Sequence, residues 1–152
     1  MRVIIAIAIF SLAMPLGANL SERSVPSIDL SPVSIYDLAE YATGAPAEIL
    51  RGIAFAESSN GKKLDHPDPL DRGWFGLHES PAIHAERAAK WFEFDADNPV
   101  QAAMIAGHLL MDNLAQLGDM RLAIAAYKQG VQGVRDDGVA EWYVERVMGA
   151  SK

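Results

Sequence analysis

The feature that most constrains the fold is the recurrence, from residue 33 onward, of glycine, proline, asparagine and aspartate, which divide the chain into short segments. Between these breaks, apolar residues recur at the spacing of one helix face, and no segment of useful length alternates apolar and polar residues. Several segments open with proline or a capping side chain and close with glycine, as helices do. We therefore predict an all-α domain over 33–150. Its expected helices, about six in number, cover 34–42, 46–59, 81–92, 99–117, 120–130 and 139–148.

One long irregular stretch, 61–79, interrupts this helical pattern. Pro67, Pro69, Gly73 and Gly76 exclude a continuous helix there. Irregular stretches of this length in a compact domain usually contribute to function. We therefore expect this loop to line a cleft.

Two aromatic residues in that loop, Trp74 and Phe75, lie between Gly73 and Gly76. Glycines allow the backbone to approach a ligand closely. Aromatic rings suit stacking on the apolar faces of sugars, but in a tight turn they also serve as core residues. Both interpretations of the pair stay open at this stage.

The N-terminus has the pattern of a secretory signal. Arg2 precedes the apolar run 3–13, and a small residue, Ala18, follows helix breakers. We expect a signal peptide over 1–18 with cleavage after Ala18, a linker over 19–32 and a periplasmic or secreted mature chain. The apolar run is shorter than a transmembrane helix requires, so no stable membrane span is expected after cleavage; the alternative is an uncleaved anchor.

Charge and cysteine content exclude several classes of protein. The formal net charge is −7 and the sequence contains no basic run, which argues against nucleic-acid binding. Cysteine is absent, so disulfides, thiolate zinc sites and a cysteine nucleophile are excluded. We expect no cofactor.

A carboxylate ends the apolar face of the second expected helix. On a helical wheel Glu57 falls between Leu50 and Ile53. Burying a carboxylate favours its protonated form unless it finds a partner, and a protonated carboxylic acid is what a general acid requires. The alternative is a glutamate at a frayed helix end that faces solvent.

Four motifs in order resemble those of the lytic transglycosylase (SLT-type) catalytic domain, a lysozyme-like family related to goose-type lysozymes. They are Ala56-Glu57-Ser58-Ser59, Gly73 to Glu79 (GWFGLHE), Ala125 to Gly130 (AAYKQG) and Tyr143-Val144. The similarity covers about 35–148. It implies a lysozyme-like helical domain that cleaves peptidoglycan glycan strands.

The resemblance also implies roles for individual residues. Glu57 matches the general acid that cleaves the β-1,4 bond between N-acetylmuramic acid and N-acetylglucosamine, and that then acts as base to close a 1,6-anhydro ring. The residues that match substrate-binding positions are Ser58, Gly76, Leu77, His78, Glu79, Tyr127, Lys128 and Tyr143. Partners in the envelope machinery are compatible with the family, but the motifs identify none.

The sequence departs from the family at three cleft positions. His78, Glu79 and Lys128 replace the usual Met, Gln and Asn. Glu79 and Lys128 either form an ion pair across the cleft or leave Glu79 alone near Glu57. Glu79 or Asp71 could instead act as base for water, which would give an inverting, lysozyme-like hydrolase. A binding module without catalysis is the third alternative.

The loop also contains several residues of metal-binding type. These are Asp65, His66, Asp68, Asp71 and His78, with His84 following. Prolines interrupt their spacing, and no glutamate stands at the last position of an EF-hand loop. We therefore predict a solvated acidic loop and no metal site.

Overall fold

The computed structural model describes residues 33–151, so the signal peptide and linker expected over 1–18 and 19–32 lie outside the described residues. Within the described part, six helices follow one another with a short hairpin between the second and third. The helices are α1 (Ile35–Thr43), α2 (Ala47–Ser58), α3 (Pro81–Lys90), α4 (Pro99–Leu117), α5 (Met120–Asp137) and α6 (Glu141–Ala150). The predicted all-α class is confirmed.

Local signals account for most helix ends. The Ser34 hydroxyl accepts from the Asp37 N–H in a capping box that begins α1. Asn98 caps α4 through the N–H groups of Val100 and Gln101, and Asp119 caps α5. Such caps are encoded within a few residues, which is why the sequence predicted these ends closely.

The end of the fifth helix was predicted wrongly. We expected it to end at Gly130 and a connection to follow, but the chain resumes helical structure and α5 extends to Asp137. Gly130 has φ 75° and ψ 160°, which is not helical, so it forms a kink between two helical pieces. The glycine therefore redirects the helix without ending it.

The prediction of no strands was also incomplete. β1 (Asp71–Arg72) and β2 (Leu77–His78) form an antiparallel pair in which Asp71 lies opposite His78. Each strand has two residues, too few for an alternating pattern to appear in the sequence. The hairpin nevertheless brings the two ends of the loop together.

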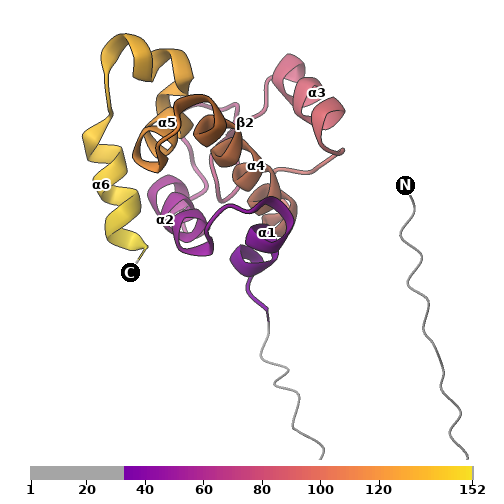
Figure 1. Ribbon diagram of the computed structural model, residues 1–152. Coiled ribbons are helices and arrows are strands. Elements are labelled where there is room, and N and C mark those ends of the chain that lie inside the picture. The colour runs from indigo at the N-terminus through magenta and orange to yellow at the C-terminus, as the bar shows by residue number, and fades with distance from the viewer. Residues whose placement is uncertain (1–32, 152) are drawn as a thin grey trace, which may run out of the picture. The chain divides into compact units, whose positions relative to one another are not determined.

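The core forms where α4 packs against α1 and α5, and α2 packs against α6 (Figure 1). Gly52 allows the last of these contacts, because a Cβ there would lie 2.3 Å from the Val147 carbonyl oxygen. Helix α3 differs from the others: it contributes no buried residue and projects away from the bundle. Among the described helices, none combines the length and apolar character needed to cross a membrane.

Candidate functional site

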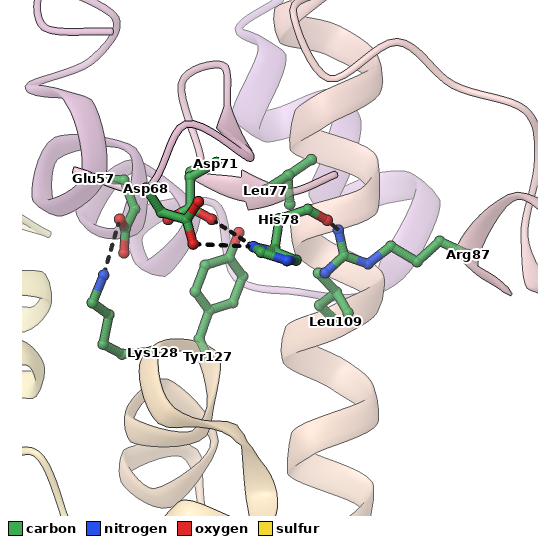
Figure 2. A pocket seen from close by; sticks show the side chains of 10 residues that line it. Glu57, Asp68, Asp71, Leu77, His78, Arg87, Leu109, Tyr127 and Lys128 are labelled. Carbon is green, nitrogen blue, oxygen red and sulfur yellow. Dashed lines mark hydrogen bonds and ion pairs between the residues drawn. The ribbon is translucent and has the colours of Figure 1, made fainter. Parts of the chain in front are cut away.

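A pocket of about 330 Å³ lies where the loop, α3, α4 and α5 meet the end of α2 (Figure 2). The residues that line it are Glu57, Asp68, Asp71, Gly76, Leu77, His78, Arg87, Leu109, Tyr127 and Lys128. Six of these ten carry ionisable acidic or basic side chains, so the pocket suits a polar ligand.

Glu57, in the last turn of α2, is held from α5 and α6. Its side chain is 9% exposed. The Tyr143 hydroxyl donates to Glu57 Oε1 at 2.6 Å. The other carboxylate oxygen, Oε2, lies 3.7 Å from Lys128 Nζ, so the two side chains form an ion pair but no hydrogen bond. The carboxylate is thus fixed by a hydroxyl on one side and approached by an ammonium on the other.

The loop backbone passes directly over this carboxylate. Gly76 has φ 56°, a left-handed backbone conformation that residues other than glycine rarely adopt. A Cβ at Gly76 would lie 2.7 Å from Glu57 Oε2. Glycine is therefore required at this position both for the backbone conformation and for the space that the Glu57 side chain fills.

Two tyrosine hydroxyls stay protonated beside Glu57. Burial, reinforced by the charge of Glu57, raises the pKa of Tyr127 and of Tyr143 well above the ordinary value. Tyr127 donates to the Phe75 carbonyl oxygen at 3.0 Å. Tyr143 therefore holds the carboxylate, while Tyr127 fastens the loop to α5.

The two aromatics of the loop and Ser58 have structural positions. Phe75 is fully buried and packs edge-on against Tyr36, and Trp74 is partly buried against the core. Ser58, also buried, lies 2.8 Å from the Trp74 carbonyl oxygen and accepts from the Gly61 N–H at 2.8 Å. Neither Phe75 nor Ser58 lines the pocket, so the structure does not bring Ser58 to a position where it would contact a ligand there.

Glu79 turns away from the pocket, contrary to both expectations for it. It forms ion pairs with Arg87, at 3.4 Å, and with His84, both on α3. The expected pair between Glu79 and Lys128 is wrong, because Lys128 faces Glu57 instead. His84 and Arg87 stand three residues apart on one helix face, so both can pair with the same carboxylate. A general base at Glu79 is not supported by this geometry.

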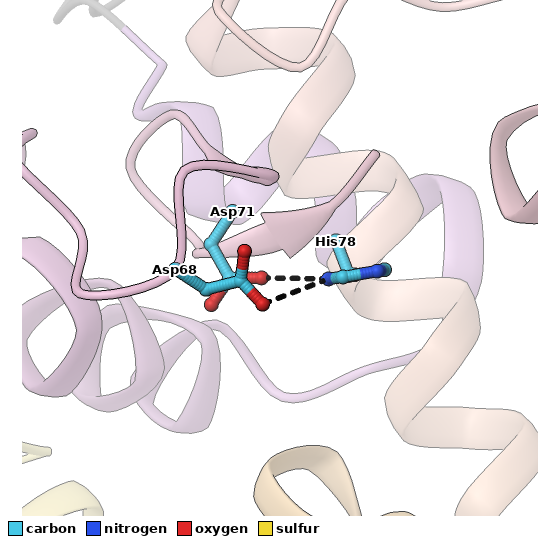
Figure 3. A group of neighbouring side chains, drawn as sticks. All are labelled: Asp68, Asp71 and His78. Carbon is cyan, nitrogen blue, oxygen red and sulfur yellow. Dashed lines mark hydrogen bonds and ion pairs between the residues drawn. The ribbon is translucent and has the colours of Figure 1, made fainter. Parts of the chain in front are cut away.

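His78 and two aspartates form a second group in the pocket (Figure 3). His78 Nδ1 lies 3.1 Å from Asp71 Oδ1 and 3.8 Å from Asp68 Oδ2. One ligand atom from each could approach a common cation, since these atoms lie within 4.8 Å of one another. The other residues considered as ligands are elsewhere: His66 bonds the Gly73 carbonyl oxygen, and His84 is paired with Glu79 and Glu93.

Arg87 and Leu109 are pocket residues that the sequence did not suggest. Arg87 donates to the His78 carbonyl oxygen at 2.9 Å, so α3 is tied to the hairpin (Figure 2). In the sequence, Arg87 is indistinguishable from any surface arginine on a short helix. Only the position of Glu79 and β2, which depends on the tertiary fold, gives it a role.

The comparison with protein-family models gives one match, the transglycosylase SLT domain, over residues 35–141. No curated protein matches the chain significantly. The family match spans well over half of the sequence and includes Glu57, the loop and the Tyr127 region, and it ends just before Tyr143. The chain therefore belongs to the SLT transglycosylase family, the lysozyme-like domain of peptidoglycan lytic transglycosylases.

Proposed function

We propose that this chain cleaves the β-1,4 bond between N-acetylmuramic acid and N-acetylglucosamine without water, with Glu57 as acid and then base. The observation that carries the proposal is the setting of Glu57: a mostly buried carboxylate at the wall of a polar pocket, oriented by the Tyr143 hydroxyl at 2.6 Å. A carboxylate oriented in this way suits proton transfer to a bound sugar.

The reaction requires two proton transfers at the same carboxylate, first from Glu57 and then back to it. Protonated Glu57 gives its proton to the glycosidic oxygen, and the bond from muramoyl C1 to that oxygen breaks through an oxocarbenium-like state. The resulting carboxylate takes the proton of the C6 hydroxyl while that oxygen bonds to C1. The products are a 1,6-anhydromuramoyl end and a free N-acetylglucosamine hydroxyl, and Glu57 is again protonated.

Hydrolysis is the second candidate, and the position of Asp71 favours it. Asp71 lines the same pocket as Glu57 and could accept a proton from water. Its Oδ1 is 3.1 Å from His78 Nδ1, which already occupies part of its accepting capacity. We place transglycosylation first because Glu57 alone supplies both of its proton transfers.

The test is product analysis on purified peptidoglycan. We expect the full chain to release muropeptides lighter by one water than reducing-end products. Glu57→Gln should lower the rate roughly 10²- to 10⁴-fold, the usual range for a general acid. Glu48→Gln, an exposed glutamate at the other end of α2, is the matched control and should leave the rate unchanged.

Other products decide between the alternatives. Reducing ends would establish a hydrolase, and Asp71→Asn should then be inactive. If the wild-type chain releases neither product but binds peptidoglycan as tightly as Glu57→Gln does, the chain is a binding module.

We also propose that the chain is exported, because its proposed substrate lies outside the inner membrane and 1–18 has the pattern of a signal peptide. N-terminal sequencing of the protein from the periplasmic or culture fraction should begin at Asn19. An N-terminus at Met1 in the membrane fraction would instead indicate an uncleaved anchor.

A further inference from the structure

We infer that Lys128 binds a carboxylate of the substrate, and that the pocket therefore selects glycans whose muramoyl residues carry a negative charge over neutral glycans. The inference rests on the proposed function for its substrate class. It adds a recognition role to a residue whose only charged contact in the described part of the chain is Glu57.

Three basic side chains line the pocket, and two of them are already engaged. Arg87 has a side chain only 14% exposed and donates to the His78 carbonyl oxygen and to Glu79. His78 is held by Asp71 and Asp68. The charge of each is thus already offset by a carboxylate of the protein at 3.1–3.4 Å.

Lys128 is in a different state. Its side chain is 39% exposed, and Nζ lies 3.7 Å from Glu57 Oε2, outside hydrogen-bonding distance. Within residues 33–151 the side chain makes no hydrogen bond, and Nζ also lies over the uncharged Tyr143 ring, 6.0 Å from its centre. An ammonium has three N–H donors, so Lys128 can donate to a ligand carboxylate at little cost.

The backbone under Lys128 is fixed while its amine is not. The preceding residue, Tyr127, packs partly buried against the core and donates a hydrogen bond to the Phe75 carbonyl oxygen, so this turn of α5 is anchored to the loop. A lysine amine moves on a flexible four-carbon stem. The ammonium can thus shift from Glu57 toward a ligand in the same pocket without moving the helix.

This shift links recognition to the acid step. Lys128 Nζ lies 3.7 Å from Glu57 Oε2, so a substrate carboxylate bound by Lys128 is placed beside Glu57. A neutral glycan cannot form this contact, so it should be positioned less well for turnover as well as bound less tightly.

Two carboxylates of peptidoglycan could serve as the anion. One is the lactyl carboxylate of muramic acid, which is free only where the peptide has been removed. The other is a carboxylate of the attached peptide. The shared chemistry is a carboxylate near the scissile bond, and glycans with and without peptides separate the two sources.

The experiment compares ligands that differ by one charge. Soluble glycan strands with free lactyl carboxylates, the same strands with those groups converted to methylamides, and strands with intact peptides are titrated calorimetrically onto the full chain. We expect the wild type to bind at least one charged form roughly tenfold more tightly than the methylamide, the value of about one charged hydrogen bond. Which charged form is preferred identifies the source.

Two substitutions at Lys128 test the assignment. Lys128→Met removes the charge while keeping the length, and should abolish the preference. Lys128→Arg should keep it. Circular dichroism and thermal unfolding establish that both variants fold, and where cleavage occurs kcat should follow the same preference as binding.

The inference is overturned if wild type binds charged and methylamide strands equally, or if Lys128→Met keeps the preference. Failure of the proposed function has a different signature. In that case no strand is cleaved, but the charge preference in binding persists in wild type and disappears in Lys128→Met.

Discussion

The two glutamates nearest the hairpin, Glu57 and Glu79, are held in contrasting ways. Glu57 projects from α2, a helix with seven buried residues, and accepts a hydrogen bond from the hydroxyl of the buried Tyr143. Glu79 joins the hairpin to α3, which has no buried residue, through ion pairs with Arg87 and His84. Glu57 thus lies on elements fixed by apolar packing, whereas α3, which carries the pocket residue Arg87, is held by charge.

The difference predicts unequal stability on the two sides of the pocket. Elements with few buried apolar contacts open locally at lower free energy than core elements do. Helix α3 should therefore move or unfold locally while the region around Glu57 stays intact. The predictions below test this contrast, from the largest expected effect to the smallest.

The largest effect should come from shortening an isoleucine in the core. Ile53, on α2, is fully buried, so Ile53→Ala should lower the free energy of unfolding by about 2–5 kcal/mol. The matched change on α3, Ile83→Ala, should cost about 1 kcal/mol or less, because Ile83 is only partly buried. Urea unfolding measures both. Equal losses would show that α3 is part of the core.

The next effect concerns the two tyrosines of the pocket. Tyr143→Phe keeps the ring but removes the hydrogen bond to a charged group, and should reduce the cleavage rate roughly 10- to 100-fold. Tyr127→Phe removes a bond to a neutral carbonyl and should reduce it less, by about tenfold or below. Steady-state rates on peptidoglycan give the ranking. The reverse order would mean that anchoring the loop matters more than orienting Glu57.

A smaller and more local effect should follow from removing the charge of Glu79. Glu79→Gln leaves Arg87 and His84 without their shared carboxylate, so we expect α3 to open more easily, by about 1–2 kcal/mol. Amide hydrogen exchange should show this in α3 but not in α2. Glu86→Gln, an exposed glutamate on the same helix, is the control and should leave exchange unchanged. Faster exchange across the whole domain would contradict a local tether.

The smallest effect is a pH dependence of the contact between Glu79 and His84 on α3. Hydrogen bonds that His84 donates to Glu79 and Glu93 raise the pKa of His84 above its usual value. The added stability is thus fully present below about pH 6.5, the ordinary value for histidine, and is lost as pH rises through the raised pKa. We expect a change of a few tenths of a kcal/mol, since the group is near the surface. The protection factors of the α3 amides should fall in the wild type as the pH rises through the raised pKa of His84, and should stay level in His84→Gln.

The fold could be predicted largely because its signals are local. Caps at Ser34, Asn98 and Asp119 act on N–H groups two or three residues away, so they can be found without knowing the tertiary structure. The errors concern features of another kind. Whether Gly130 ends a helix or only kinks it depends on what the next segment packs against, and a pairing of two-residue strands has no periodicity to detect.

For the site, the positions of motif residues could be predicted but their partners could not. The wheel places Glu57 at the edge of the apolar face, and the structure finds it mostly buried at the pocket wall. The partners of Glu79 and Lys128 depend on which cation lies nearest in space. Arg87 and His84 reach Glu79 because α3 packs beside β2, a tertiary contact that no spacing in the sequence specifies.

The hydrogen bond between Tyr143 and Glu57 has a consequence for the stage of synthesis at which the site can be completed. The two residues are 86 positions apart, so α2 emerges from the ribosome long before its partner helix exists. Contacts of such separation form late, because the intervening chain must first be ordered. A chain that stops short of α6 would hold a glutamate without the hydroxyl that orients it. If Glu57 has the proposed role, cleavage would then require the last described helix.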